Sequence, residues 1–309
     1  MELRHLRYFL VVGEVLNFTK AAARLRVAQP ALSRQIQDLE DEIGVDLLHR
    51  SPRGVTLTAE GKLFLEEVRE LLERADESVE RVRALARGEY GDLHLGYIPI
   101  PTVEILPPAV EAFRKAAPHV KLVLHDLPTD QLITELRNAT LELAIMVQPI
   151  SEQMVGIEFE TLRTYPWCVA LNESHPFARL KSVALEKVAT EPLVGLRRKG
   201  YSEYYRILEQ IFAPVSAKPR IAVECDSESS LVVEVEAGHG IALVITALKP
   251  PYGKRLLYRP LSGTTETQSV GIALAKKGDV TPAGERFCEI LRQISTGATA
   301  ALPTNASRA

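Results

Sequence analysis

The sequence has few cysteines, no long apolar run and no strong excess of charge. Cys168, Cys225 and Cys288 are too few and too far apart for a disulfide framework or a Cys-x-x-Cys metal site, so we expect inert buried thiols. No stretch of about 18 apolar residues occurs, which predicts no membrane-spanning helix and no membrane partner. The N-terminus, Met1–His5, lacks the apolar segment of a secretory signal, which favours the cytoplasm.

Acidic side chains slightly outnumber basic ones, but the basic ones are unevenly distributed. The net charge of −3 does not by itself indicate nucleic-acid binding. Two windows near the N-terminus nevertheless hold no acid, one between Glu14 and Asp38 and one between Asp46 and Glu60. Their basic residues are Lys20, Arg24, Arg26 and Arg34 in the first window, and His49, Arg50 and Arg53 in the second. This distribution predicts one basic face on a small N-terminal domain.

The first 58 residues have the pattern of a winged helix-turn-helix domain. Helices are expected over 3–13, ending at a glycine, over 20–25 after capping oxygens at 17–19, and over 29–40. The last helix would enter the major groove and expose Gln29, Pro30, Ser33, Arg34 and Gln37. Residues 48–57 form a strand, a Pro/Gly turn and a second strand, which predicts a basic wing. A generic three-helix domain with a solvated basic face is the alternative.

Three segments in this domain resemble the LysR-type transcriptional regulators. They are Phe18–Ile36, Leu39–Arg50 and Leu57–Gly61, and the resemblance is nearly continuous over residues 2–61. It implies DNA recognition by the helix at 29–37 and backbone contacts from the wing at 50–53. The DNA-binding residues then expected are Thr19, Lys20, Gln29, Pro30, Ser33, Arg34, Gln37, Arg50 and Arg53. Ala28 departs from the pattern, because many relatives have a capping serine there, worth about 1 kcal/mol.

A linker helix is expected over residues 59–88. Thr58 can cap its start and Gly88 can end it. Apolar residues recur every three or four positions and form a narrow seam that consists of Phe64, Val68, Leu71, Ala75, Val79 and Val82. Such a seam packs either on its own domain or on a second subunit. The resemblance favours the second arrangement, and implies a homodimer on a near-palindromic promoter site, assembly into a dimer of dimers, and contact with RNA polymerase.

The remaining chain alternates strands and helices, as α/β domains do. Strands are expected at 93–98, 120–125 and 141–147, with helices at 103–115, 130–138 and 282–295. The segments 172–177 and 236–244 resemble the effector-binding domain of the same family. This resemblance implies an effector-binding domain of periplasmic-binding-protein type over 89–295. Lobe one would span 91–162 and 267–295, lobe two 163–266, and residues 296–309 would be a disordered tail.

Ligands of such domains bind where strands end, between the lobes. We expect a small anionic metabolite there. Thr102, at the end of the turn Pro99-Ile100-Pro101-Thr102, would donate to it from lobe one. Lobe two would supply Arg197, Arg198, Ser202 and Ser227, and an apolar wall would consist of Leu127, Val147 and Tyr204. Two departures from relatives stand out: Ile245 in place of proline, and Val147 where some aromatic-acid sensors have arginine.

Two other classes of protein compete with a ligand sensor. The first is a catalytic domain fused to a DNA-binding domain. No Gly-x-Ser-x-Gly elbow, P-loop, Gly-x-Gly-x-x-Gly or His-Glu-x-x-His motif occurs, and a packing role for His125 is simpler than an acid–base pair with Asp126. We therefore predict no enzyme, no cofactor and no metal. The second is an architectural DNA-binding protein whose C-terminal domain only oligomerises.

Overall fold

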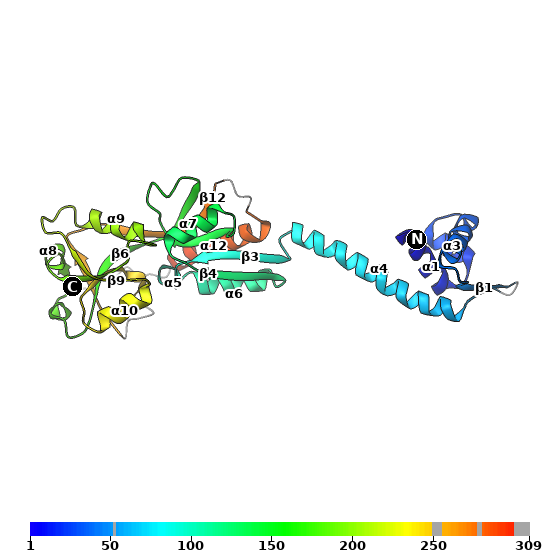
Figure 1. Ribbon diagram of the computed structural model, residues 1–309, viewed down its shortest axis with the longest axis horizontal. Helices are drawn as coiled ribbons and strands as arrows, with labels where there is room; N and C mark the ends of the chain where they lie inside the picture. The colour runs from blue at the N-terminus through cyan, green and yellow to red at the C-terminus, as the bar shows by residue number, and fades with distance from the viewer. Residues whose placement is uncertain (52–53, 249–254, 277–279, 300–309) are drawn as a thin grey trace. The chain divides into compact units, whose positions relative to one another are not determined.

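The computed structural model describes residues 1–51, 54–248, 255–276 and 280–299. These residues form two compact units, which divide between Ala84 and Leu85. Figure 1 shows the elements of each unit. None of the described helices is long and apolar enough to cross a membrane.

The N-terminal unit contains three helices, a two-stranded wing and most of a long helix. Its elements are α1 (Leu3–Val15), α2 (Phe18–Leu25), α3 (Gln29–Ile43), β1 (Leu48–Ser51), β2 (Gly54–Leu57) and α4 (Ala59–Ala86). The strands of the wing are antiparallel, with Leu48 opposite Leu57. A buried core that includes Phe9, Leu32, Ile36 and Leu39 joins α1 to α3. The helix-turn-helix is therefore assembled on one apolar centre.

Two helices of this unit run further than the sequence indicates. The expectation that α1 ends at Gly13 is wrong, because the helix continues to Val15 and closes at Leu16, whose backbone is left-handed (φ 49°). Gly13 lies buried inside the helix instead. Helix α3 continues past Glu40 to Ile43, since no helix-breaking residue occurs before Gly44 at φ 81°. Its N-cap, Ala28, makes no side-chain hydrogen bond.

Lobe one of the C-terminal unit contains a mixed sheet covered by helices. Its elements are β3 (Gly91–Tyr97), α5 (Pro99–Thr102), α6 (Leu106–Ala116), β4 (Val120–Asp126), α7 (Thr129–Arg137), β5 (Leu143–Val147), the first part of β6 (Ile157–Leu171), β12 (Thr267–Ala275) and α12 (Pro282–Thr299). The strand order is β4-β3-β5-β12-β6, and β3 is parallel to both neighbours. Phe113 of α6 and Phe287 of α12 pack edge to face, with ring centroids 5.1 Å apart.

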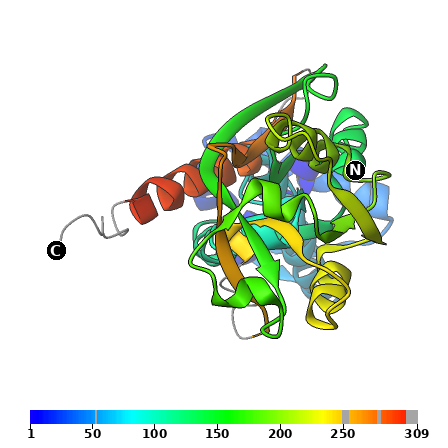
Figure 2. The ribbon, with the colours of Figure 1, turned by 90° about the vertical axis from the view of Figure 1, so that its left-hand side faces the viewer.

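Lobe two is built around the second part of β6. Its other elements are η1 (Pro176–Arg179), β7 (Val183–Ala184), α8 (Leu185–Val188), β8 (Pro192–Leu196), α9 (Ser202–Ile211), β9 (Arg220–Cys225), α10 (Glu228–Glu236), β10 (Ala242–Ile245), η2 (Thr246–Leu248) and β11 (Leu257–Ser262). Strands β10 and β11 pair with β6, β11 with β7, and β8 with β9. Lobe two faces the viewer in Figure 2, with α10 in yellow.

The long strand β6 joins the two lobes. Residues 157–166 pair with β12 of lobe one, and residues 167–171 pair with β10 and β11 of lobe two. The change of partner therefore falls between Pro166 and Trp167, a few residues after the expected border at 162/163. Because the strand is continuous there, the lobes share one piece of hydrogen-bonded backbone, and Trp167 stands at their junction.

Two further expectations for this unit are wrong. The segment Pro99–Thr102 is a short helix, α5, rather than a turn, since proline is well tolerated in the first turn of a helix. The disorder expected for residues 296–299 is wrong, because α12 continues to Thr299. The rest of that tail, residues 300–309, lies outside the described residues.

Candidate DNA-binding surface and effector cavity

The second helix of the helix-turn-helix, α3, presents a polar face to solvent. Gln29, Pro30, Arg34 and Gln37 are exposed, and Ser33 is half-buried. The guanidinium of Arg34 forms no ion pair or hydrogen bond with any described residue. Thr19 and Lys20 are exposed at the start of α2, where the side chain of Asn17 accepts from the backbone N–H of Lys20 at 3.0 Å. This face offers amide and guanidinium donors of the kind that reach base edges.

Arg50 of the wing is held by its own domain. Its guanidinium donates to Glu40 of α3 at 2.6 Å and lies 5.6 Å from the ring centroid of Phe18. Glu40 is only 7% exposed and also accepts from the backbone N–H groups of Leu47 and Leu48, at 2.9 and 3.0 Å. Arg50 therefore neutralises a buried carboxylate that fixes the wing to α3. Arg53 lies outside the described residues.

Helix α4 divides the expected seam into two parts. Phe64 packs on Phe9, with ring centroids 5.3 Å apart, and Val68 is 1% exposed. Both belong to the core of the N-terminal unit, together with Leu72, which the expected spacing omitted. Val68 is thus enclosed in its own domain, and assigning it to a subunit seam was wrong. Phe64 is only half-buried, so its place in the seam stays a prediction.

The rest of the seam is exposed among the described residues of the N-terminal unit. Leu71 is 46% exposed, Val79 is 48% exposed and Val82 is 68% exposed. Ala75 is half-buried between the two parts. Exposed apolar residues in a row on a helix indicate a partner surface.

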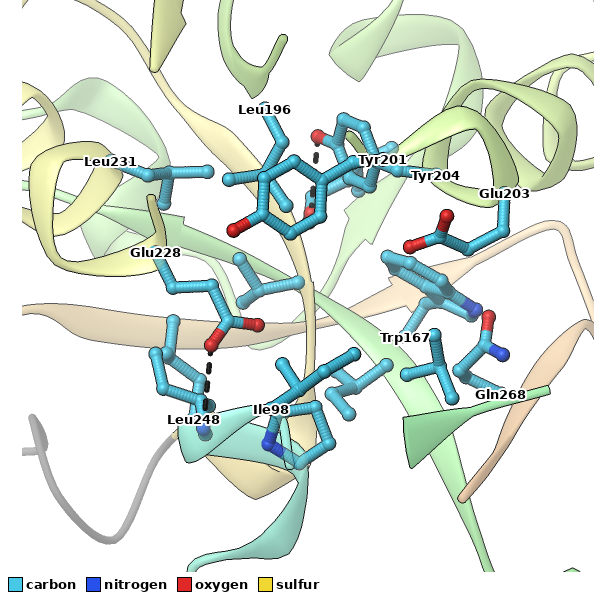
Figure 3. Close-up of a pocket in the computed structure, with 16 residues that line it drawn as sticks. Ile98, Trp167, Leu196, Tyr201, Glu203, Tyr204, Glu228, Leu231, Leu248 and Gln268 are labelled. Carbon is cyan, nitrogen blue, oxygen red and sulfur yellow. Dashed lines mark hydrogen bonds between the residues drawn. The ribbon is translucent and has the colours of Figure 1, made fainter. Parts of the chain in front are cut away.

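A largely apolar cavity lies between the two lobes of the C-terminal unit (Figure 3). The space inside it that water-sized probes can occupy is about 60 Å³. Residues of both lobes line it: Ile98, Ile100, Pro101, Val147, Trp167, Leu196, Tyr201, Glu203, Tyr204, Glu228, Leu231, Leu243, Val244, Ile245, Leu248 and Gln268. Four of the expected effector residues, Ile100, Pro101, Val147 and Tyr204, are therefore brought together here.

The other lobe-one residues expected in the site do not line the cavity. Thr102 is buried, but its hydroxyl donates to the backbone carbonyls of Ile98 and Pro99, at 2.6 and 3.2 Å, and so closes the short helix α5. Pro99 is exposed, and Leu127 packs at the edge of the core. The hydroxyl of Thr102 is thus used within the chain, which corrects its assignment as a ligand donor.

The polar residues expected from lobe two are also engaged elsewhere. Ser202 donates to Asp130 at 2.8 Å. Ser227 caps α10 by accepting from the backbone of Ser230 at 3.2 Å. Arg197 and Arg198 are exposed, and Arg198 lies 4.4 Å from the ring centroid of Tyr205. Arg197 and Arg198 lie in the exposed segment that follows β8 and do not line the cavity, so the expected cationic wall is wrong.

Two glutamates, Glu203 and Glu228, line the cavity where arginines were expected. Burial raises the pKa of Glu203 to about 7, although a hydrogen bond from Thr129 lowers it. Burial also raises the pKa of Glu228 to about 8, with Asp126 and Glu203 adding to the effect. Sequence reasoning missed both residues, and also Trp167, Tyr201 and Gln268. Their only signal was position: Glu203 and Glu228 each lie next to a serine that was expected in the site.

Comparisons with known proteins agree with this architecture. Residues 3–62 match the family model for the bacterial regulatory helix-turn-helix protein of the lysR family, and residues 86–295 match the LysR substrate binding domain. The chain belongs to the LysR family. It is a DNA-binding transcription regulator with a domain for small-molecule effectors, and not an enzyme.

Several regulators are similar to this LysR-family chain over most of its length. AlsR of Bacillus subtilis (strain 168), a transcriptional regulator, is 34% identical over 261 residues, which cover 84% of this chain and 86% of AlsR. HcaR of Escherichia coli (strain K12), an operon activator, is 32% identical over 97% of this chain and 100% of HcaR. Full-length CbnR in complex with its target DNA gives a TM-score of 0.78 at 29% identity, over 96% of this chain and 100% of that one.

Proposed function

We propose that α3 enters the major groove and that Arg34 binds a base edge there. The observation that carries this proposal is the state of the Arg34 side chain, which is exposed and without an ion pair among the described residues. A free guanidinium can form the bidentate pair with guanine that is the commonest specific contact. Gln29, Ser33 and Gln37 share its face, while Pro30 shapes the start of the helix.

Contacts to the DNA backbone come from neighbouring positions in this proposal. Thr19 and Lys20 are exposed at the N-terminus of α2, where backbone N–H groups and a positive helix end favour phosphate. Arg53 stays a predicted phosphate contact on the wing. Arg50 is paired with Glu40, which favours a role in holding the wing in place over a direct contact with DNA phosphate.

The exposed part of the α4 seam supports a homodimer. Leu71, Val79 and Val82 are apolar and exposed, and pairing with the same helix of a second copy would cover them. Two copies would present two recognition helices, which suit a near-palindromic promoter site. The same proposal includes the assembly of two dimers and contact with RNA polymerase. It also includes location in the cytoplasm, where bacterial DNA lies.

The effector binds in the cavity between the lobes in this proposal. The cavity is mostly apolar with a few polar groups, as small-molecule sites usually are. Binding would alter DNA affinity only through different affinities for two arrangements of the protein, with a typical coupling of about 1–3 kcal/mol.

The base-reading role of Arg34 is tested with two variants on specific and random DNA. Arg34→Ala should lose about 1–3 kcal/mol of affinity for the specific site and little for random DNA at equal salt. Arg34→Lys keeps the charge but not the bidentate geometry, so it should keep the salt dependence and still lose discrimination. Equal losses of Arg34→Ala on both DNAs would rule out base reading.

A further inference from the structure

The polar groups of the cavity are acidic, although its walls are apolar. Glu203 lies near the start of α9 and Glu228 at the start of α10, and Figure 3 shows them on opposite sides of the cavity. Among the described residues, no lysine, arginine or histidine lines it. A ligand that enters this space therefore meets two carboxyl groups and no cation from the described part of the chain.

Two buried polar atoms of cavity-lining residues have no hydrogen-bond partner in the part of the chain that the structure describes. Glu203 is 7% exposed, and its Oε1 accepts from Thr129 of α7 at 2.8 Å, while its Oε2 is buried without a partner. Nε1 of Trp167, on the strand that joins the lobes, is likewise buried and unpaired. Buried polar atoms in folded proteins are nearly always paired. Glu203 and Trp167 both line the cavity, so its wall contains one acceptor and one donor that no described residue satisfies.

The surroundings of both glutamates are also acidic. Asp130 lies near Glu203, and Asp126 and Glu203 both lie near Glu228, whose carboxylate accepts from the backbone N–H of Ile100 at 3.3 Å. Arg197 is the cation whose charge acts on the neighbouring Tyr201. A carboxylate ligand would add a negative charge to this group in a poorly solvated space, which is unfavourable.

Aromatic rings complete the wall. Trp167 and Tyr204 have ring centroids 6.3 Å apart, and Tyr201 lines the same cavity. The faces of such rings attract cations, most strongly when the cation is desolvated. Acids, aromatic faces and a free carboxylate oxygen together favour a positively charged group on an apolar body.

We propose that the effector cavity takes a small, mainly apolar organic amine, whose ammonium group donates a hydrogen bond to Oε2 of Glu203. The proposal rests on the cavity being the effector site, and it replaces the anionic effector that the sequence suggested. An acceptor oxygen on the ligand would pair with Nε1 of Trp167. Glu228, on the opposite wall, supplies a second negative charge once the bound ammonium group favours its ionised form.

Glu203 also takes part in the hydrogen bonds that join the two lobes. Its hydrogen bond to Thr129 runs from lobe two to lobe one. Beside it, Asp130 of α7 accepts from the backbone N–H of Gly200 at 3.0 Å and from Ser202 at 2.8 Å. An ammonium bound to Glu203 acts at the point where these contacts hold the lobes together.

The test uses matched probes on the full-length protein. Benzylamine, benzyl alcohol and benzoate share one skeleton, as do hexylamine, hexanol and hexanoate. Trp167 is the single tryptophan of the chain, so its fluorescence reports on the cavity alone. We expect the amines to bind about tenfold or more tightly than the alcohols and carboxylates, because hydrogen bonds to charged groups are the stronger ones. Equal or tighter carboxylate binding, or no fluorescence response to either amine, would overturn the proposal.

The pH dependence gives an independent readout. An amine stabilises ionised Glu203 and Glu228, so amine affinity should rise between pH 6 and pH 8.5, as carboxyls with pKa values of about 7 and about 8 lose their protons. The charged groups that act on these two glutamates and on the neighbouring Tyr201 are Asp126, Asp130 and Arg197. An amine affinity that falls with pH would contradict the assignment.

Isosteric variants locate the contact. Glu203→Gln should weaken amine binding about ten- to hundredfold and leave alcohol binding nearly unchanged. The control is Glu209→Gln, an exposed residue of the same helix that pairs with Arg198, and it should bind amines as the parent does. Equal amine affinities for Glu203→Gln and the parent would overturn the proposal.

DNA binding separates failure of the ligand class from failure of the effector site. If carboxylates quench Trp167 fluorescence and change DNA affinity, the cavity is the effector site and the amine assignment is wrong. If a metabolite changes DNA affinity while it leaves Trp167 fluorescence unchanged, the cavity is not the effector site, and both proposals fail.

Discussion

The two units place their functional side chains in opposite ways. In the N-terminal unit, inward residues such as Val68 hold the fold, and outward residues such as Arg34 and Leu71 are free for partners. In the C-terminal unit, inward residues such as Leu243 and Tyr204 both form the core and line the cavity. Stability and binding are thus separable in the first unit and shared in the second. A DNA surface has to be open to a large polyanion, whereas a small ligand is bound by being enclosed.

The largest effect is expected from charges placed on the two sides of α4. Val68→Glu buries an unpaired carboxylate and should destabilise the N-terminal unit by about 3 kcal/mol or more. The double variant Leu71→Glu with Val79→Glu places its charges on exposed positions, so it should stay folded and lose the dimer. Thermal melts and sedimentation measure the two outcomes. An intact dimer of the double variant would show that this part of the seam does not join subunits.

A truncation in the cavity wall should affect stability and binding together. Leu243 is fully buried in β10, and Leu243→Ala should lower the free energy of unfolding by about 2–5 kcal/mol while it changes ligand affinity. Val233→Ala, at an exposed position of α10 in the same lobe, is the control and should change stability by less than about 0.5 kcal/mol. If Leu243→Ala changed stability alone, the two roles would be separable after all.

Two arginines of the N-terminal unit should contribute differently to its stability. Arg50→Ala leaves the buried carboxylate of Glu40 without its cation and should lower stability by about 1–3 kcal/mol. Arg34→Ala removes an exposed side chain and should change stability by less than about 0.5 kcal/mol. Chemical denaturation of both variants without DNA measures the contrast. Equal stabilities would mean that the Arg50 pair contributes as little as an ordinary surface ion pair.

The dependence of stability on pH concerns the C-terminal unit alone. The folded-state pKa values of Glu203 and Glu228, about 7 and about 8, lie above their ordinary value of 4.5. Groups with raised pKa values bind protons more tightly in the folded state, so their stabilisation is complete below about pH 4.5 and is lost as pH rises to about 8. Melting of the ligand-free protein between pH 5 and pH 8.5 should show this loss, and Glu203→Gln with Glu228→Gln should reduce it. An identical pH slope in the double variant would speak against both shifts.

The sequence predicted the N-terminal unit well because its signals are local. Caps, turns and apolar spacing depend on neighbours a few residues apart, and Leu32, Ile36 and Leu39 are buried as a helical stripe predicts. The features that the sequence did not predict there depend on contacts between residues far apart in the chain. The pairing of Arg50 with Glu40 joins the wing to α3, and the division of α4 depends on where the core of the unit ends.

The cavity could be predicted only in part. Apolar residues near strand ends, such as Val147, lie where alternating strands and helices place them. Polar partners were assigned by residue type and nearness in sequence, which led to Thr102 and Arg198. The hydroxyl of Thr102 instead bonds to its own backbone within one helical turn, a contact that competes with any ligand.

The sequence by itself determined the family, the helix-turn-helix, the linker helix and the alternating pattern of the C-terminal unit, because each follows from local periodicity and motif. Only the tertiary structure decided the charge of the cavity. Whether a side chain such as Glu203 or Arg197 points inward depends on how α9 and β8 pack against lobe one. That packing joins residues about 70 positions apart, as in the hydrogen bond between Thr129 and Glu203. Burial then changes the chemistry of the residue itself, raising the pKa of a carboxyl that would be an ordinary anion on the surface.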